Sequence, residues 1–242
     1  MATATTDVQH LYDVDRGRGD ASDVVVAILP LPSARRMFGV LAFAAAALCG
    51  LSLLDLALGQ TSPLLRLFDT AYEGNVPTWL SSAMWLAAGL FAYAIGVAAR
   101  RLEDPSGGRW LLLGGCFLLL AVDETAQAHE LVVGPLIDAV EQVTGLAHGP
   151  ARLAAVACAG AGLLALAAWL WPWMRALPQA LQARLLAAGV VFVGGALGLE
   201  VLSRLVETQY LSPFEELGEM LGVALLLTAL LPYVRAIIAR TP

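Results

Sequence analysis

MFGVLAFAAAALCGLSLLDLALG, residues 37–59, is an apolar stretch that carries a single charged residue, Asp55. An α-helix rises about 1.5 Å per residue, so a helix over this stretch is long enough to cross the roughly 30 Å hydrocarbon core of a bilayer. An apolar run of this length with so little charge is typical of a membrane-spanning segment. The stretch therefore predicts a transmembrane helix.

Five more apolar stretches of similar length follow, separated by segments rich in Gly, Pro and Ser such as residues 104–108. The sequence thus predicts an all-α fold, a polytopic transmembrane bundle of about six spans. The expected spans are residues 37–59, 77–99, 110–133, 151–174, 181–206 and 213–238. We expect one transmembrane domain over residues 37–238, preceded by a cytoplasmic, largely mobile tail at residues 1–36.

The composition agrees with a bilayer as the solvent, because 59% of the residues are hydrophobic and only 14% are charged. The formal net charge of -6 does not favour nucleic acid as a partner. The lipid bilayer is the expected surrounding, and other membrane subunits or further copies of the chain are expected candidate partners.

Arginines mark one side of the expected bundle. If six spans alternate in direction, most arginines fall at span ends on the same side: Arg35, Arg36, Arg100, Arg101, Arg109, Arg175, Arg184, Arg235 and Arg240. Cytoplasmic flanks of membrane proteins retain positive charge. The pattern therefore predicts that both termini are cytoplasmic and that the protein lies in the plasma (inner) membrane.

Acidic residues gather at the opposite ends of the spans. Ionisable groups at membrane depth are costly unless they are paired, protonated or bound to a cation, so this cluster is a candidate site. The candidate ligands of a cation are Glu124, His129, Glu130, Glu200, Glu215 and Glu219. The candidate supporting residues are Asp123, Arg204, Glu207 and Glu216.

Helical phase refines this set. If the third span is an unbroken helix, Asp123, Gln127 and Glu130 share one face, and His129 points about a third of a turn away. His129 is therefore a less certain ligand than its neighbouring carboxylates. Asp55, near the outer end of the first span, is either a proton-relay group or a hydrated side chain.

Three functions remain open. The first is binding of a cation, either a divalent metal ion of unknown identity or a proton, by the carboxylate cluster. The second is an intramembrane metal-dependent enzyme, with catalytic residues unknown. The Glu-x-x-His pairs of di-iron bundles do not occur, which disfavours that type of site. The third is a structural subunit of a larger membrane complex, with Arg204 paired to neighbouring glutamates.

The tryptophans and glycines are expected to have structural roles. The tryptophans lie mostly near span ends, where an interfacial aromatic belt is expected: Trp79, Trp85, Trp110, Trp169, Trp171 and Trp173. Small residues allow close approach of helices, which is the role expected for Gly114, Gly115, Gly194, Gly195, Gly198, Gly218 and Gly222.

Three polar motifs carry a resemblance. They are FD…E.N.PTW from Phe68 to Trp79, DE….HE from Asp123 to Glu130, and EE..E from Glu215 to Glu219. With these motifs the chain resembles an uncharacterised bacterial family of six-span integral membrane proteins over roughly residues 37–238. The resemblance implies the same helical bundle and the same polar positions, and it implies no activity.

Overall fold

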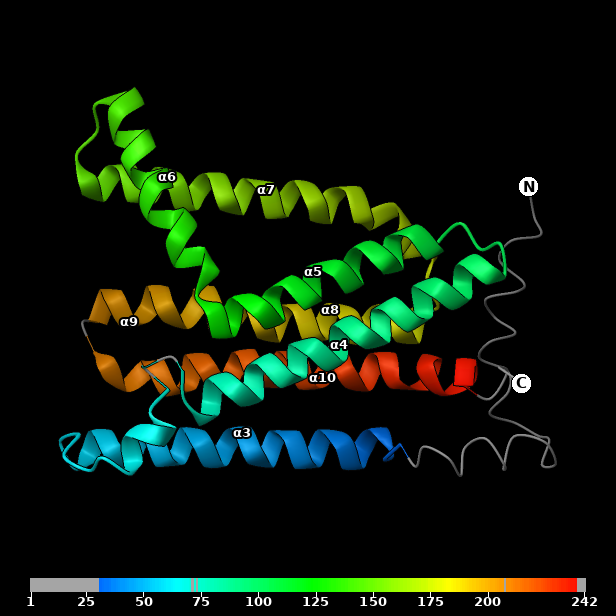
Figure 1. The fold of residues 1–242 in the computed structure, drawn as a ribbon, viewed down its shortest axis with the longest axis horizontal. Helices are drawn as coiled ribbons and strands as arrows, with labels where there is room; N and C mark the ends of the chain where they lie inside the picture. The colour runs from blue at the N-terminus through cyan, green and yellow to red at the C-terminus, as the bar shows by residue number, and fades with distance from the viewer. Residues whose placement is uncertain (1–30, 71, 73, 207, 239–242) are drawn as a thin grey trace.

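The computed structural model describes residues 31–70, 72, 74–206 and 208–238, and this part of the chain consists of helices joined by loops, without a strand (Figure 1). Most of the expected tail, residues 1–30, lies outside the described residues. The helical fold class is confirmed for the described chain.

The helices follow the apolar stretches of the sequence. The long helices are α3 (Ala34–Ala57), α4 (Val76–Arg101), α5 (Gly107–Ala126), α6 (Ala128–Thr144), α7 (His148–Ala176), α8 (Gln179–Val193) and α10 (Ser212–Ile238). The short elements are the 3-10 turn η2 (Leu65–Phe68), the π-helical segment η3 (Gly194–Leu199), the helix α9 (Glu200–Val206) and the 3-10 turn η4 (Gln209–Leu211).

The expectation of an unbroken third span is wrong. The helix α5 ends at Ala126, Gln127 adopts a left-handed conformation with φ of 52°, and a new helix begins at Ala128. The helix α6 then turns away from the direction of α5 (Figure 1). The helical phase expected for an unbroken span therefore does not apply, because Asp123 belongs to α5 whereas His129 and Glu130 belong to α6.

The fifth span also departs from a regular helix. It consists of α8, the π-helical segment η3 and α9. A π-helical turn holds more residues than an α-helical turn, so it shifts the direction of every side chain that follows. The faces of α8 and α9 are therefore not continuous.

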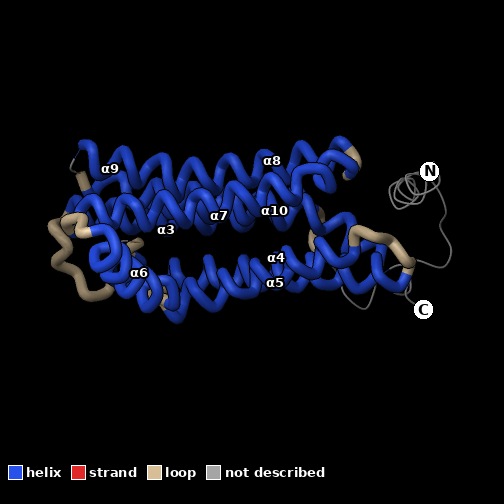
Figure 2. The backbone as a smooth tube through the Cα atoms, turned by 90° about the horizontal axis from the view of Figure 1, so that it is seen from above, coloured by secondary structure: helices blue, strands red, loops and turns tan. Residues whose placement is uncertain are grey.

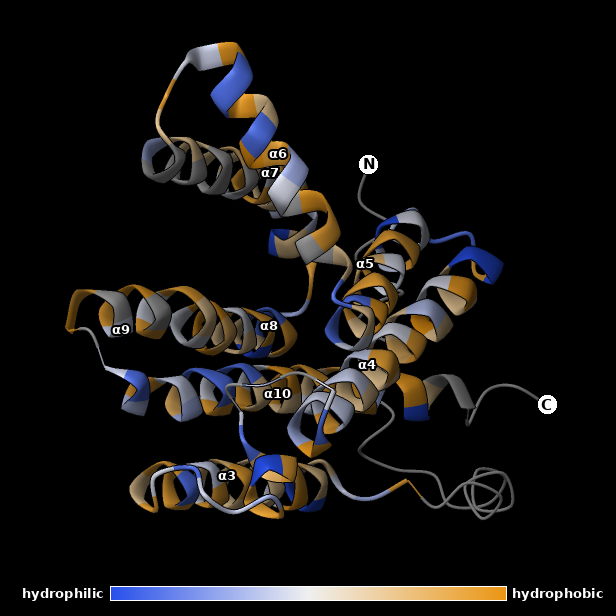
Figure 3. Cartoon of the chain, turned by 60° about the vertical axis from the view of Figure 1, so that its left-hand side comes forward, coloured by the Kyte–Doolittle hydropathy of each residue, from blue (hydrophilic) through white to orange (hydrophobic). Residues whose placement is uncertain are grey.

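Four segments of the described chain are long and apolar enough to cross a membrane. They are Ala34–Ala57, Val76–Arg101, Gln179–Ser203 and Gln209–Ala236. Large apolar side chains also cover the outer surface, among them Phe43, Leu119 and Leu205, which are 77%, 70% and 76% exposed. Hydrophobic residues follow most of the length of the helices (Figure 3). Such a surface suits a bilayer, since a soluble monomer rarely exposes contiguous apolar patches of this extent.

The bundle places the start of α3 and the end of α10 at the same end (Figure 1). The end of α4, the start of α5, the end of α7 and the start of α8 lie at this end too (Figure 1). The arginines Arg100, Arg101, Arg109, Arg175 and Arg184 lie in or beside these helix ends. Most arginines of the described helices therefore gather at one end of the bundle, whereas Arg66, Arg152 and Arg204 belong to η2, the start of α7 and α9.

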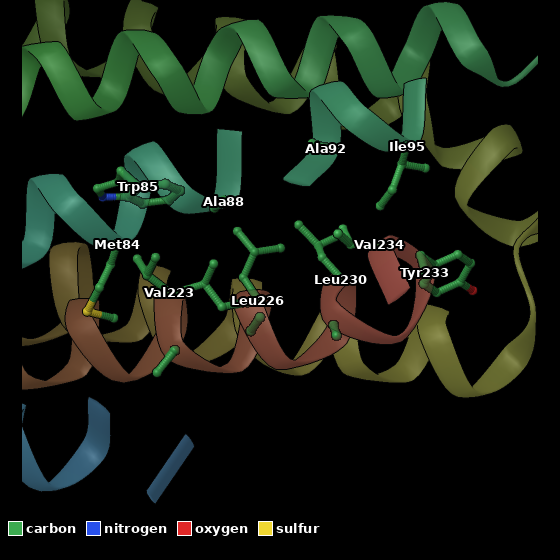
Figure 4. Close-up of a cluster of buried hydrophobic side chains, with 14 of the residues drawn as sticks. Met84, Trp85, Ala88, Ala92, Ile95, Val223, Leu226, Leu230, Tyr233 and Val234 are labelled. Carbon is green, nitrogen blue, oxygen red and sulfur yellow. The ribbon is translucent and has the colours of Figure 1, made fainter. Parts of the chain in front are cut away.

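The helix α10 is central to the packing. It contacts α3, α4 and α8, and α4 packs in turn along α5, beside which it lies in Figure 2. The core between α4 and α10 is formed by side chains such as Met84, Ala88 and Ile95 on one side and Val223 and Leu230 on the other (Figure 4). The contact of α10 with three neighbours fixes the position of its polar first turns.

Some of the expected glycine contacts are confirmed. A Cβ atom on Gly114 would lie 2.9 Å from the backbone nitrogen of Tyr93, and one on Gly195 would lie 2.8 Å from the backbone nitrogen of Glu219. Gly218 and Gly222 make equally close contacts with α8 or η3. The expectation is wrong for Gly115, Gly194 and Gly198, which face open space.

The expected aromatic belt is only partly present. Trp79, Trp169 and Trp171 are exposed, as expected. In contrast, Trp85, Trp110 and Trp173 are buried and pack against other rings, such as Phe117 and Phe192 around Trp85. The belt interpretation is therefore wrong for these three tryptophans, because their side chains point into the bundle.

Candidate functional site

Asn75 holds the loop between α3 and α4 in place by hydrogen bonds of its side chain. The Asn75 Oδ1 accepts a hydrogen bond from the backbone N–H of Thr78 at 3.2 Å and so caps the N-terminus of α4. The Asn75 Nδ2 donates to the carbonyl oxygens of Asp69 and Tyr72. One side chain thus ties the loop to the start of α4.

A buried polar cluster attaches the same loop to α3. The Thr70 N–H donates to Ser52 Oγ at 3.2 Å, and the two hydroxyl oxygens of Ser52 and Thr70 lie 3.0 Å apart. Asp69 is 1% exposed, and its carboxylate accepts a hydrogen bond from Gln60 Nε2 at 3.2 Å. Asp69 therefore lies inside the bundle with donors of its own, and is not a residue of a hydrated loop.

A cavity of about 270 Å³ lies beneath this loop. Its walls combine carboxylates, hydroxyl groups and aromatic rings that come from the loop and from α4, α5, α8 and α10. The lining residues are Thr70, Tyr72, Pro77, Thr78, Trp85, Leu120, Asp123, Glu124, Phe192, Glu216 and Glu219. We call this cavity the carboxylate pocket.

Four of the sequence-predicted site residues line the carboxylate pocket: Asp123, Glu124, Glu216 and Glu219. The first two lie in the last turn of α5, and the other two lie in the first turns of α10. The N-terminus of a helix stabilises acidic residues through its dipole, so α10 can carry several glutamates at this end. The structure thus places these four residues, from two helices remote in sequence, around one cavity.

The contact between η3 and α10 sets the position of the α10 carboxylates. Gly195 approaches the backbone of Gly218 and Glu219 so closely that a Cβ atom would lie 2.9 Å or less from their backbone atoms. Phe192 packs in the same way against Gly222. Small residues on both helices therefore allow Phe192, Glu216 and Glu219 to reach the same cavity.

The remaining predicted residues do not line the carboxylate pocket as far as the structure describes them. Glu215 lies in the first turn of α10 and is not among the lining residues. The backbone of His129 and Glu130 lies in the first turn of α6, and that of Glu200 and Arg204 lies in α9. The side chains of these four residues, and all of Glu207, lie outside the described part of the chain.

Among the described residues, no group of three or more His, Cys, Asp or Glu side chains is arranged to hold a metal ion. The carboxylates of the pocket are distributed over the walls of α5 and α10. They line two sides of a cavity, whereas Ca²⁺ or Mg²⁺ requires a single shell of oxygen atoms around the ion.

Several pocket residues were missed by sequence reasoning. Thr78 belongs to the PTW motif, so the motif itself was a signal for it. Trp85 was assigned to an aromatic belt, and only its 6% exposure reveals the inward orientation. No sequence pattern indicated that Tyr72, Thr70 or Phe192 belongs to a site.

Asp55 is a second unusual carboxylate near this end of α3. It is 0% exposed, and neither of its carboxylate oxygens has a hydrogen-bond partner in the part of the chain that the structure describes. The expectation of a hydrated side chain is therefore wrong, and the proton-relay interpretation remains.

No curated protein and no solved structure matches the chain. A family model does match, over residues 37–233, and its description is a domain of unknown function, DUF8692. The match includes every residue that lines the carboxylate pocket. The expected membership of an uncharacterised family is thereby confirmed, and the chain belongs to the DUF8692 family.

Proposed function

We propose that this protein is a multi-pass protein of the plasma membrane that binds a cation in the carboxylate pocket. In this proposal about six helices cross the membrane, both termini are cytoplasmic, and the pocket opens toward the opposite side. The gathering of arginines at one end of the bundle supports this orientation, because positive flanks remain in the cytoplasm. The carboxylates at the other end then face the extracytoplasmic side.

The observation that carries the proposal is the lining of the pocket. Asp123 and Glu124 approach the cavity from α5, and Glu216 and Glu219 approach it from α10. Carboxylates on two walls of one small space give it a negative potential. This lining favours a cation over a neutral or anionic ligand.

The walls of the pocket favour an organic ammonium ion over a bare metal ion. The rings of Tyr72, Trp85 and Phe192 line the same cavity as the carboxylates. Aromatic faces attract ammonium groups by cation–π interaction, and this attraction is greatest where water is excluded. A volume of about 270 Å³ also accommodates a small organic cation. The divalent metal expected from the sequence remains the alternative ligand to compare.

The hydroxyl groups of Thr70 and Thr78 add orientation to the proposed site. Both residues line the cavity, and Thr78 Oγ1 is held 3.2 Å from Asn75 Oδ1 at the start of α4. A ligand with N–H groups can donate to the carboxylates and to these hydroxyl oxygens. A primary ammonium ion therefore gains hydrogen bonds that a quaternary ion does not.

Thermal unfolding of the purified protein in detergent tests the proposal. Ethylammonium and tetramethylammonium chloride form one arm, and MgCl₂, MnCl₂ and ZnCl₂ form a second arm, each compared with NaCl at equal ionic strength. A ligand present at about 100 times its Kd stabilises the native state by about 2.7 kcal/mol, which raises the unfolding temperature measurably. We expect stabilisation by the ammonium ions.

The matched variants are Glu216→Gln with Glu219→Gln, and Glu215→Gln alone. All three residues lie in the first turns of α10, and only the first two line the pocket. The double variant should lose the ammonium effect and the Glu215 variant should keep it. If divalent metals alone stabilise the protein, the ligand is a metal ion and not an ammonium ion. If ammonium ions stabilise all variants equally, the cation binds outside the carboxylate pocket.

A further inference from the structure

Asp55 lies inside the bundle, and no described residue donates a hydrogen bond to its carboxylate. The residue is 0% exposed, and both of its carboxylate oxygens lack a partner among the described residues. It belongs to α3, one of the four segments apolar enough to cross a membrane. An ionised carboxylate in such surroundings is strongly destabilised, and it is normally neutralised by a proton or a paired cation.

Asp69 provides an internal comparison. It is 1% exposed, almost the same as Asp55, but its carboxylate oxygens lie 3.2 Å from Gln60 Nε2 and 3.5 Å from Ser52 Oγ, and both of these groups donate to it. Hydrogen bonds from donors stabilise the charged form of a carboxylate. The two buried aspartates at this end of the bundle therefore differ in the stabilisation that their charged forms receive.

The elements packed against this end of α3 provide mostly negative groups. The α3 helix contacts η2 and α10. The η2 segment and the residue after it contribute Arg66, which is exposed to solvent, and Asp69. The first turns of α10 contribute Glu215, Glu216 and Glu219.

A pair of hydroxyl groups connects this face of α3 with the carboxylate pocket. Ser52 lies one helical turn before Asp55, so the two side chains lie on the same face of α3. The hydroxyl oxygen of Ser52 is 3.0 Å from that of Thr70, and Thr70 lines the pocket. Hydroxyl groups donate and accept hydrogen bonds, so they can pass a proton between neighbouring groups.

We propose that Asp55 is a proton-binding site within the bundle. Its carboxyl group is the buried acceptor of this proton, and the hydroxyl pair of Ser52 and Thr70 lies between its face of α3 and the carboxylate pocket. This site is separate from the proposed cation ligand of the pocket, because it takes a proton and is formed by a different helix.

Infrared spectroscopy of the purified protein in detergent at pH 7, without added ammonium or divalent ions, tests the proposal. The carbonyl stretch of a protonated acid is separated from the stretches of a carboxylate. Incorporation of ¹³C-carboxyl aspartate shifts the bands of aspartates only. We expect one protonated band that shifts with the aspartate label. Absence of such a band in the unmodified chain would overturn the proposal without any variant.

Variants assign the band. Asp55→Asn should abolish it, while Asp69→Asn, the matched control of equal burial, should leave it in place. Asp55→Glu should transfer the band from the aspartate label to a glutamate label, which covers the case in which Asp55→Asn does not fold. A band that survives in Asp55→Asn, or that disappears in Asp69→Asn, would refute the assignment. A protein that fails to bind any cation in its pocket still gives this infrared result.

Discussion

Substitution of Gly114 by alanine tests the packing of α4 against α5. The added Cβ atom would lie 2.9 Å from the backbone nitrogen of Tyr93 and 3.1 Å from the carbonyl oxygen of Gly89. Both contacts are made by backbone atoms of α4, which cannot rotate away as a side chain can. The two helices must therefore move apart, and overpacking of this kind typically costs about 1–3 kcal/mol.

Gly115→Ala is the matched control for this substitution. Gly115 is the next residue of α5, and a Cβ atom there would meet nothing within 4 Å. Replacing Gly by Ala within a helix also contributes about 1 kcal/mol of stability through helix propensity, and both variants share this gain. The difference between the two variants therefore isolates the packing cost.

The assay is reversible unfolding in mixed micelles, in which the fraction of SDS is increased and helicity is followed by circular dichroism. The free energy of unfolding should be about 1–3 kcal/mol lower for Gly114→Ala than for Gly115→Ala. Equal free energies for the two variants, or a more stable Gly114 variant, would refute the close contact between α4 and α5.

Two further predictions concern the loop and the orientation. Asn75→Ala should lower the free energy of unfolding by about 1–2 kcal/mol in the same assay, because α4 loses its N-cap and the loop loses the bonds to Asp69 and Tyr72; no change would contradict that role. In a chain without native cysteines, Thr61→Cys in the loop after α3 should react with a membrane-impermeant maleimide on intact spheroplasts, and Glu103→Cys in the turn after α4 should react only after lysis. The reverse labelling pattern would invert the proposed orientation.

The helices were predictable because the signal for a membrane helix is local. The run from Met37 to Gly59 carries its apolar character within its own residues, and α3 covers almost all of it. Carboxylates at equal depth, such as Glu124 and Glu219, could also be brought together by counting residues along alternating helices. Both lie in the carboxylate pocket.

The remaining features depend on contacts between helices. The segment around Gln127 contains no Pro or Gly, yet α5 ends there. Gly114 and Gly115 are adjacent and identical in type, and only the position of α4 distinguishes them. Trp85 has the same local signals as an interfacial tryptophan, but it faces inward because α4 presents that side to α8 and α10.

Binding of an ammonium ion to the purified protein is the most direct test of the account. Isothermal titration of ethylammonium chloride into the native chain should give a saturable heat with one ion bound per chain, because the carboxylates of α5 and α10 line one shared cavity. The Glu216→Gln, Glu219→Gln variant should give no saturable heat. Saturable binding of equal affinity in the native and variant proteins, or no saturable binding of any ammonium or divalent ion to the native chain, would contradict cation binding in this pocket.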